Sequence, residues 1–254
     1  MRTFALIVAV AVAATRLSAA AQNPDVADDR VAQFYSYRVT DQTKFEAGYR
    51  EHLGWHARND DPLVWYAWTV ETGPRRGLFV DGTAGASFAA LDGRVKPDED
   101  GADFRRTAAP HAEAIDVETW ALWRQPSIAT PLEDRKPSAI IDIFTVEVTP
   151  RDVQAFERAM VALGAARGDD GSVRLSWYRR LRGGDGPVYL AMLARDDWTD
   201  LGAAGGTFPE MLQRAYGASP EAAGRLLDRI ASIGVETWRY EPRLSLMPGS
   251  ALAP

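Results

Sequence analysis

The sequence predicts an α+β protein made of two tandem β-α-β-β-α-β units, and three observations support this prediction. First, residues 117–120 and 235–238 both read Val-Glu-Thr-Trp. Second, three dipeptides recur upstream in the same order, namely Val39-Thr40 with Val148-Thr149, Phe45-Glu46 with Phe156-Glu157, and Trp65-Tyr66 with Trp177-Tyr178. Third, strand-like and helix-like patterns follow one another in the same sequence in both copies. An internal duplication explains why the matches keep their order.

The first copy shows the order of elements directly. Apolar and β-branched runs predict its strands, and apolar residues at spacings of three and four predict its first helix. We expect strands at residues 34–39, 63–71, 78–81 and 117–123, and helices at residues 42–57 and about 103–115.

The second copy repeats this order after an alternating strand at residues 140–148. Thr149, Pro150 and Asp152 then supply an N-cap, a proline at the first helical position and an acid in the first turn. An apolar stripe follows at helical spacing, formed by Val153, Phe156, Met160 and Leu163. The remaining elements are expected as strands at residues 172–182 and 188–195, a helical region at 209–233 broken near Gly217, and a last strand at 235–240.

The domain organisation follows from the duplication. We place the first unit at residues 31–123, a linker with three prolines at 124–138, and the second unit at 139–246. A four-stranded sheet with helices on one face leaves its other face bare, so two fused copies can cover each other. One chain would then complete the assembly, and we expect a monomer.

The N-terminus is typical of a secretory signal peptide. Arg2 provides a positive start, residues 4–14 form a short apolar run, and residues 18–22 offer a cleavage site after Ala21. The apolar run is shorter than the roughly 20 residues of a spanning helix. We therefore expect residues 1–21 to be removed and the mature protein to be periplasmic or secreted, without a membrane anchor.

The composition excludes several kinds of chemistry. The chain has 29 basic and 35 acidic residues, a net charge of −6 and no cysteine. Without cysteine there is no disulfide, no thiolate catalysis and no zinc–thiolate site. An acidic chain without a basic stripe is a poor ligand for phosphate backbones, so we expect no nucleic-acid partner.

Taken together, the element order, the duplication and the aromatic strand ends over residues 31–246 resemble the dimeric α/β-barrel superfamily. Its ferredoxin-like units pair sheet to sheet to form a barrel with helices outside. The resemblance implies two tandem ferredoxin-like units that form such a barrel within one chain. It also implies a relationship to antibiotic-biosynthesis-type and haem-degrading monooxygenases, to chlorite-dismutase-like and dye-peroxidase-like haem proteins, or to members without an assigned activity. One fold hosts many functions, and no catalytic signature is matched here.

Two histidines on the first helix are the best candidates for a site. His52 and His56 are four residues apart and share the apolar stripe with Tyr49. In the second copy, Met160 takes the place of Tyr49, Leu163 that of His52 and Arg167 that of His56. Burying such polar groups costs free energy unless partners are provided. A ligand pocket between helix and sheet is one interpretation, and amphipathic residues bonded to backbone or water are the other. A metal site would need a third ligand; none is apparent, so we predict no metal.

The third histidine and the aromatic residues give weaker candidates. Some haem-binding members of the superfamily carry their axial histidine on the helix before the last strand, and His111 resembles that placement. Trp65, Trp68 and Trp120 lie on predicted strands and either line an apolar cavity or hold the two sheets together. Glu118 and Glu236 match between the copies and are either buried bases or ends of salt bridges. The acidic run Asp98-Glu99-Asp100-Gly101 reads as a solvated loop.

The predicted function is the binding of a small apolar or aromatic molecule in a pocket of the first unit. Its expected lining is Tyr49, His52, His56, Trp65, Trp68 and Trp120, with His111 as a possible haem ligand. One alternative is a cofactor-independent monooxygenase or a haem-dependent enzyme of the superfamily. Another is a structural or interaction module without a pocket. No cofactor is required by the sequence, and the identity of the ligand stays open.

Overall fold

The computed structural model describes residues 30–167, 173–203, 206–250 and 252. The predicted signal peptide lies outside these residues. The described chain forms eight strands that close into one antiparallel barrel in the order β1-β3-β2-β8-β5-β7-β6-β4. The strands are β1 Arg30–Val39, β2 Tyr66–Thr72, β3 Phe79–Ser87, β4 Ala112–Leu122, β5 Ile140–Val148, β6 Leu175–Arg182, β7 Val188–Arg195 and β8 Ile230–Tyr240. The predicted α+β class with two tandem ferredoxin-like units is confirmed.

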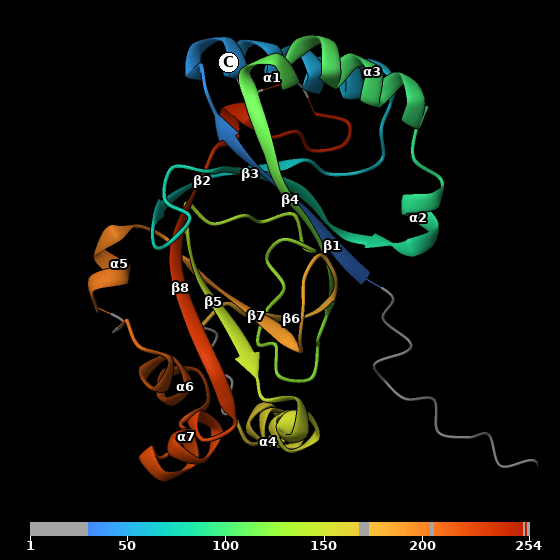
Figure 1. The fold of residues 1–254 in the computed structure, drawn as a ribbon. Coiled ribbons are helices and arrows are strands. Elements are labelled where there is room, and N and C mark those ends of the chain that lie inside the picture. The colour runs from blue at the N-terminus through green and yellow to red at the C-terminus, as the bar shows by residue number, and fades with distance from the viewer. Residues whose placement is uncertain (1–29, 168–172, 204–205, 251, 253–254) are drawn as a thin grey trace, which may run out of the picture.

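The helices lie outside the barrel in two groups. They are α1 Gln42–Arg58, α2 Phe88–Asp92, α3 Pro97–Thr107, α4 Val153–Ala166, α5 Trp198–Ala203, α6 Phe208–Tyr216 and α7 Pro220–Leu227. Figure 1 shows α1 and α3 side by side over the sheet of the first unit, while α4, α6 and α7 cover the opposite side of the barrel. No helix among the described residues is long and apolar enough to cross a membrane.

The two units are joined edge to edge through two strand pairs, β2 with β8 and β4 with β6. Inside the resulting barrel, Trp68 of the first unit contacts Trp238 of the second, with ring centroids 5.7 Å apart. Phe34 meets both indoles edge-on. The barrel interior is therefore a packed aromatic and aliphatic core, as the interpretation of the aromatics as contacts between the sheets predicts.

Two ion pairs repeat across the joints between the units. Arg75 binds Glu236 through several hydrogen bonds, and Arg180 reaches Glu118 at 3.4 Å. The arginine of each pair comes from one unit and the glutamate from the other. Glu118 and Glu236 are thus ends of salt bridges, and the recurring Val-Glu-Thr-Trp sequence places each glutamate two residues before a barrel tryptophan.

Several predicted local features differ from the structure, among them the strand expected at residues 78–81, which continues to Ser87. The helix expected at about 103–115 ends at Thr107, because Pro110 has no N–H to continue it, and β4 begins at Ala112. The helical region expected to reach residue 233 ends at Leu227, and Ile230 already belongs to β8. Residues 150–152 form a short 3₁₀ turn before α4, and the Thr149 side chain makes no cap. The acidic run at residues 98–101 is the first turn of α3 and not a loop.

Candidate metal centre

Helix α1 carries three polar side chains on the face that packs against the sheet. Asp41 caps the helix by accepting a hydrogen bond from the N–H of Lys44, which fixes where the helix starts. From that start, Tyr49, His52 and His56 all fall on the buried face and are 1 %, 6 % and 2 % exposed. The three positions predicted to lie on the inner face of this helix are therefore buried.

Helix α3 packs against α1 and supplies the acidic partners of the histidines. Pro97 starts this helix, and Asp100 and Asp103 face α1 from its first and second turns. Gly48 makes the close approach possible, because a Cβ atom at this position would overlap the carbonyl oxygen of Thr107. The site thus depends on one helix–helix contact.

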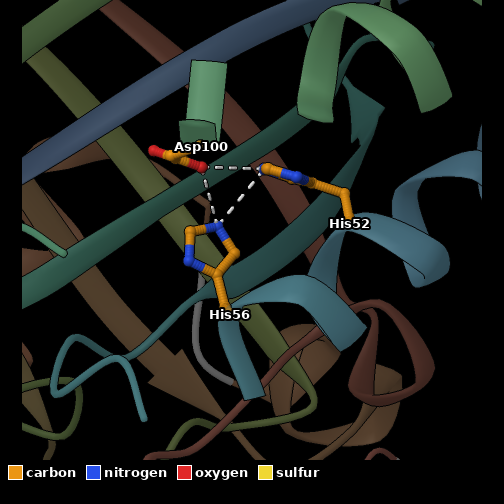
Figure 2. A group of neighbouring side chains, drawn as sticks. All are labelled: His52, His56 and Asp100. Atoms are coloured by element: carbon orange, nitrogen blue, oxygen red, sulfur yellow. Dashed lines mark hydrogen bonds and ion pairs between the residues drawn. The ribbon is translucent and has the colours of Figure 1, made fainter. Parts of the chain in front are cut away.

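Three possible metal-binding atoms converge between the two helices. His52 Nε2 and His56 Nε2 lie 3.2 Å apart, and each lies 3.4 Å from Oδ1 of Asp100. Figure 2 shows the three side chains pointing toward one another from α1 and α3. Within the described part of the chain, these are the residues whose ligand atoms come close enough together for a shared metal ion.

The other nitrogen of each imidazole is held by a carboxylate. His52 Nδ1 lies 3.0 Å from Asp103, and His56 Nδ1 lies 2.7 Å from Asp61. Asp61 also accepts hydrogen bonds from the Leu63 N–H and the Trp65 indole. Burial alone would raise the pKa of Asp61, but the bonds from His56, Leu63 and Trp65 outweigh it and hold the pKa below its ordinary value. An ionised Asp61 accepts only, so Nδ1 is the protonated nitrogen of His56.

The same reasoning applies to His52. Burial would raise the pKa of Asp103, yet the hydrogen bonds from His52 and Arg106 lower it. Burial in turn lowers the pKa of His52 itself, which favours the neutral imidazole that binds metals. When both imidazoles are neutral and carry their protons on Nδ1, their Nε2 lone pairs point at each other and at the Asp100 carboxylate. In that state three acceptors face one another without a donor, and a cation between them would stabilise the arrangement.

The spacing of these atoms fits a small tetrahedral ion. In a tetrahedral site with metal–ligand bonds of about 2.0–2.1 Å, ligand atoms lie about 3.3–3.4 Å apart. The observed separations of 3.2, 3.4 and 3.4 Å match this value. An octahedral ion with bonds of about 2.1 Å would bring neighbouring ligands to about 3.0 Å.

A cavity of about 150 Å³ lies beside two of these three residues. His52 and Asp100 form part of its wall. The remaining wall residues are Tyr35, Tyr37, Trp65, Asp81, Arg94, Gly101 and Phe104. The wall is mainly aromatic with a few polar groups, a composition that suits a small organic ligand.

Comparison with solved structures identifies the fold. A candidate monooxygenase from Lactobacillus acidophilus matches with a TM-score of 0.55 and 11 % identity, over 89 % of this chain and 100 % of that chain. An anthrone oxidase-like protein matches with a TM-score of 0.51 and 14 % identity, over 89 % and 96 %. A candidate chlorite dismutase matches with a TM-score of 0.51 and 11 % identity, over 84 % and 94 %.

The chain has the dimeric α/β-barrel fold. At identities this low the likeness concerns the fold alone, and it does not carry an activity. No protein-family model matches the sequence. No curated protein matches it either. The resemblance inferred from the sequence is thus confirmed at the level of the dimeric α/β barrel.

The barrel separates the aromatic residues predicted to line one pocket. Side chains alternate along β2, so Trp65, just before the strand, faces the helices, whereas Trp68 faces the interior. Trp120 on β4 also lies in the interior core. The structure therefore brings Tyr49, His52, His56 and Trp65 together and places Trp68 and Trp120 apart from them.

Haem does not fit the described histidines of this dimeric α/β barrel. His111 ends a short 3₁₀ turn before β4 and is not on a helix. Its side chain takes no part in the cavity beside the metal ligands. His52 borders a space of about 150 Å³, which holds one ring and not the four pyrroles of a porphyrin.

Four acidic residues of the site were missed by sequence reasoning: Asp61, Asp81, Asp100 and Asp103. The prediction of no metal rested on the lack of a third possible ligand, and the structure places the Asp100 carboxylate close to both histidines. A signal for it was available, because Pro97 followed by three acids is typical of a helix start. A helix there would have placed Asp100 and Asp103 on one face.

Proposed function

We propose that this chain is a metalloprotein of the dimeric α/β-barrel type that holds one zinc ion on His52, His56 and Asp100. The observation that carries the proposal is the convergence of two imidazole nitrogens and one carboxylate oxygen at 3.2–3.4 Å from one another. Two nitrogens and one carboxylate oxygen are a usual donor set for catalytic zinc, which keeps its fourth position open. The carboxylates behind both histidines match the outer shell that orients metal ligands.

The open position supports a role for the cavity. Because His52 and Asp100 border it, a molecule in the cavity would lie next to the ion. A zinc ion with three protein ligands acts as a Lewis acid and lowers the pKa of a bound water. We therefore propose that the small molecule bound in the first unit is acted on, or held, at this ion.

A second candidate is an oxygenase that needs no metal. The names of two similar structures, a candidate monooxygenase and an anthrone oxidase-like protein, favour this alternative. The aromatic wall of the cavity would suit an electron-rich ring. The two candidates differ in one property, since the oxygenase would keep its activity after chelation.

Metal titration tests the proposal. The mature chain is treated with EDTA, desalted and titrated with Zn²⁺ by calorimetry. Native mass spectrometry then measures the mass of the complex. We expect one ion per chain, and we expect His52→Ala and Asp100→Ala to abolish tight binding. His111→Ala is the matched control, because His111 lies outside the cavity, and it should bind as the parent does. A parent protein that takes up no ion, or a His111→Ala variant that loses it, would contradict the assignment.

A further inference from the structure

The most unusual acidic residue of the cavity is Asp81 on β3. Its side chain points to the helix-covered face of the sheet and is 4 % exposed. The Tyr49 hydroxyl donates a hydrogen bond of 2.6 Å to Oδ2. The other oxygen, Oδ1, is buried and has no hydrogen-bond partner among the described residues.

An unpartnered carboxylate oxygen in the interior is costly. Leaving a buried acceptor unsatisfied costs free energy of folding, and more when the group is charged. Most buried polar atoms of native proteins therefore have a partner. Asp81 is part of the wall of the cavity beside the metal ligands, so a molecule bound there would lie next to this carboxyl group.

The second unit shows that the fold does not require an acid here. Strand pairing matches Gly82 with Tyr66 in the first unit and Leu190 with Tyr178 in the second. By this register, Tyr189 takes the place of Asp81. Tyr189 packs on Phe156 and bonds to Glu157. In the second unit an aromatic ring thus fills this position, and only the first unit, which has the histidines, carries a carboxylate there.

The cavity limits what can reach Asp81. Its volume of about 150 Å³ is smaller than the roughly 300 Å³ at which drug-sized sites begin. Tyr37 and Phe104, whose centroids are 5.6 Å apart, form part of its apolar wall. A single ring fits these dimensions better than a fused system.

We infer that Asp81 is a ligand-binding residue whose Oδ1 accepts a hydrogen bond from a ring-sized organic molecule bearing a hydroxyl or amino group. The inference deepens the proposed function and rests on it for the ion at the other side of the cavity. Metal binding and Asp81 recognition use different side chains, so each can fail alone.

The test compares phenol with anisole, which has the same ring and no O–H donor. Both probes are titrated by calorimetry into the Zn²⁺-loaded and the EDTA-treated protein at about pH 8.5, above the pKa of Asp81, which burial raises to about 7. We expect phenol to bind the parent about tenfold tighter than anisole, the difference that one hydrogen bond to a charged group supplies. Aniline, an N–H donor, separates amino from hydroxyl ligands.

Variants assign the preference to Asp81. In Asp81→Asn, the Tyr49 hydroxyl keeps the amide oxygen and the NH₂ group turns to the cavity, so phenol should lose about tenfold while anisole is unchanged. Tyr49→Phe leaves the carboxylate in place and should keep the preference for phenol. Glu133→Gln is the matched control, because Glu133 is another carboxylate bonded by a tyrosine, Tyr178, away from this cavity. Its phenol affinity should equal that of the parent.

The outcomes separate the two proposals. Equal affinities for phenol and anisole in the parent protein would overturn the assignment of Asp81, and this comparison needs no variant. An Asp81→Asn protein that binds Zn²⁺ normally and keeps the phenol preference would overturn it as well. A parent protein that binds no Zn²⁺ but prefers phenol in the EDTA-treated form would contradict the proposed metal centre and would leave Asp81 as the ligand-binding residue.

Discussion

The Nε2 atoms of His52 and His56 lie 3.2 Å apart, and in the neutral imidazoles neither donates to the other, because the protons sit on the Nδ1 atoms that donate to Asp103 and Asp61. The two carboxylates therefore decide which face of each imidazole is free. They do so from different elements, since Asp103 belongs to α3 and Asp61 follows α1. The outer carboxylates should matter to the metal although neither touches it.

Replacing the outer carboxylates should weaken metal binding. We expect Asp61→Asn and Asp103→Asn to lower the Zn²⁺ affinity about 10- to 100-fold each, because the neutral amide orients the imidazole less firmly. Competition with a chromophoric chelator measures the change. Glu113→Gln, at an exposed ion pair with Arg38, is the control and should leave the affinity unchanged. Full Zn²⁺ affinity in both Asn variants would show that these carboxylates are not needed to orient the histidines.

Part of the site was visible in the sequence because of the duplication. His52 and His56 stand out when α1 is compared with the apolar stripe of the second copy, where Leu163 replaces His52. The expected helix–sheet location follows from helical periodicity alone. Tyr49 shares this helix face, and Trp65, which is outside the helix, contacts His56 in the same cluster.

The acidic half of the site could not be derived in the same way. Asp100 reaches the histidines because α3 crosses α1 at Gly48, and helix pairing is a tertiary property that one sequence does not specify. Asp81 was hidden for another reason: its strand was expected to end at residue 81, and the turn-like Asp81-Gly82 pair concealed a strand that continues to Ser87. Trp68 and Trp120 were assigned to the cavity because the face of each strand was not resolved by pattern.

Asp81 should make stability depend on pH. Burial raises its pKa from 3.8 to about 7, partly opposed by the hydrogen bond from Tyr49. A carboxyl group whose pKa is higher in the folded state stabilises the fold fully below its unfolded pKa and loses that contribution as the pH rises through about 7. The parent should therefore lose a few kcal/mol relative to Asp81→Asn between pH 4 and pH 9. Urea unfolding in EDTA at several pH values measures this, and parallel curves for the two proteins would contradict it.

The ion pair between Arg75 and Glu236 should stabilise the joint between the units. The Glu236 side chain is 7 % exposed and also accepts a hydrogen bond from the Trp238 indole. Glu236→Gln should cost about 1–3 kcal/mol of unfolding free energy, because it leaves the arginine poorly paired. Glu113→Gln breaks an ion pair whose side chains are about 60 % exposed and should cost less than about 1 kcal/mol. Equal losses in chemical denaturation would argue against a special role of the joint.

We propose that residues 1–21 are a signal peptide, and the mass of the mature chain tests it. Expression of the full sequence in a bacterium with a secretory pathway should yield a periplasmic or secreted protein that begins at Gln22. Intact-mass spectrometry and N-terminal sequencing read this directly. An Ala19→Arg and Ala21→Arg double variant should block processing, since small residues are needed at the cleavage site. A cytoplasmic protein of full mass from the unchanged sequence would refute the proposal.

Substitutions at two glycines of α1 distinguish the effect of helix packing from the effect of helix propensity. A Cβ at Gly48 would overlap the Thr107 carbonyl oxygen, whereas one at Gly54 would meet only the flexible end of Arg58 at 3.0 Å. Gly48→Ala should therefore push α3 away from α1, destabilise the fold by about 1–3 kcal/mol and weaken Zn²⁺ binding by moving Asp100. Gly54→Ala should keep the affinity and add up to about 1 kcal/mol, the gain of alanine over glycine inside a helix. If Gly48→Ala lowered stability without lowering the Zn²⁺ affinity, the contact between α1 and α3 would not be what positions Asp100.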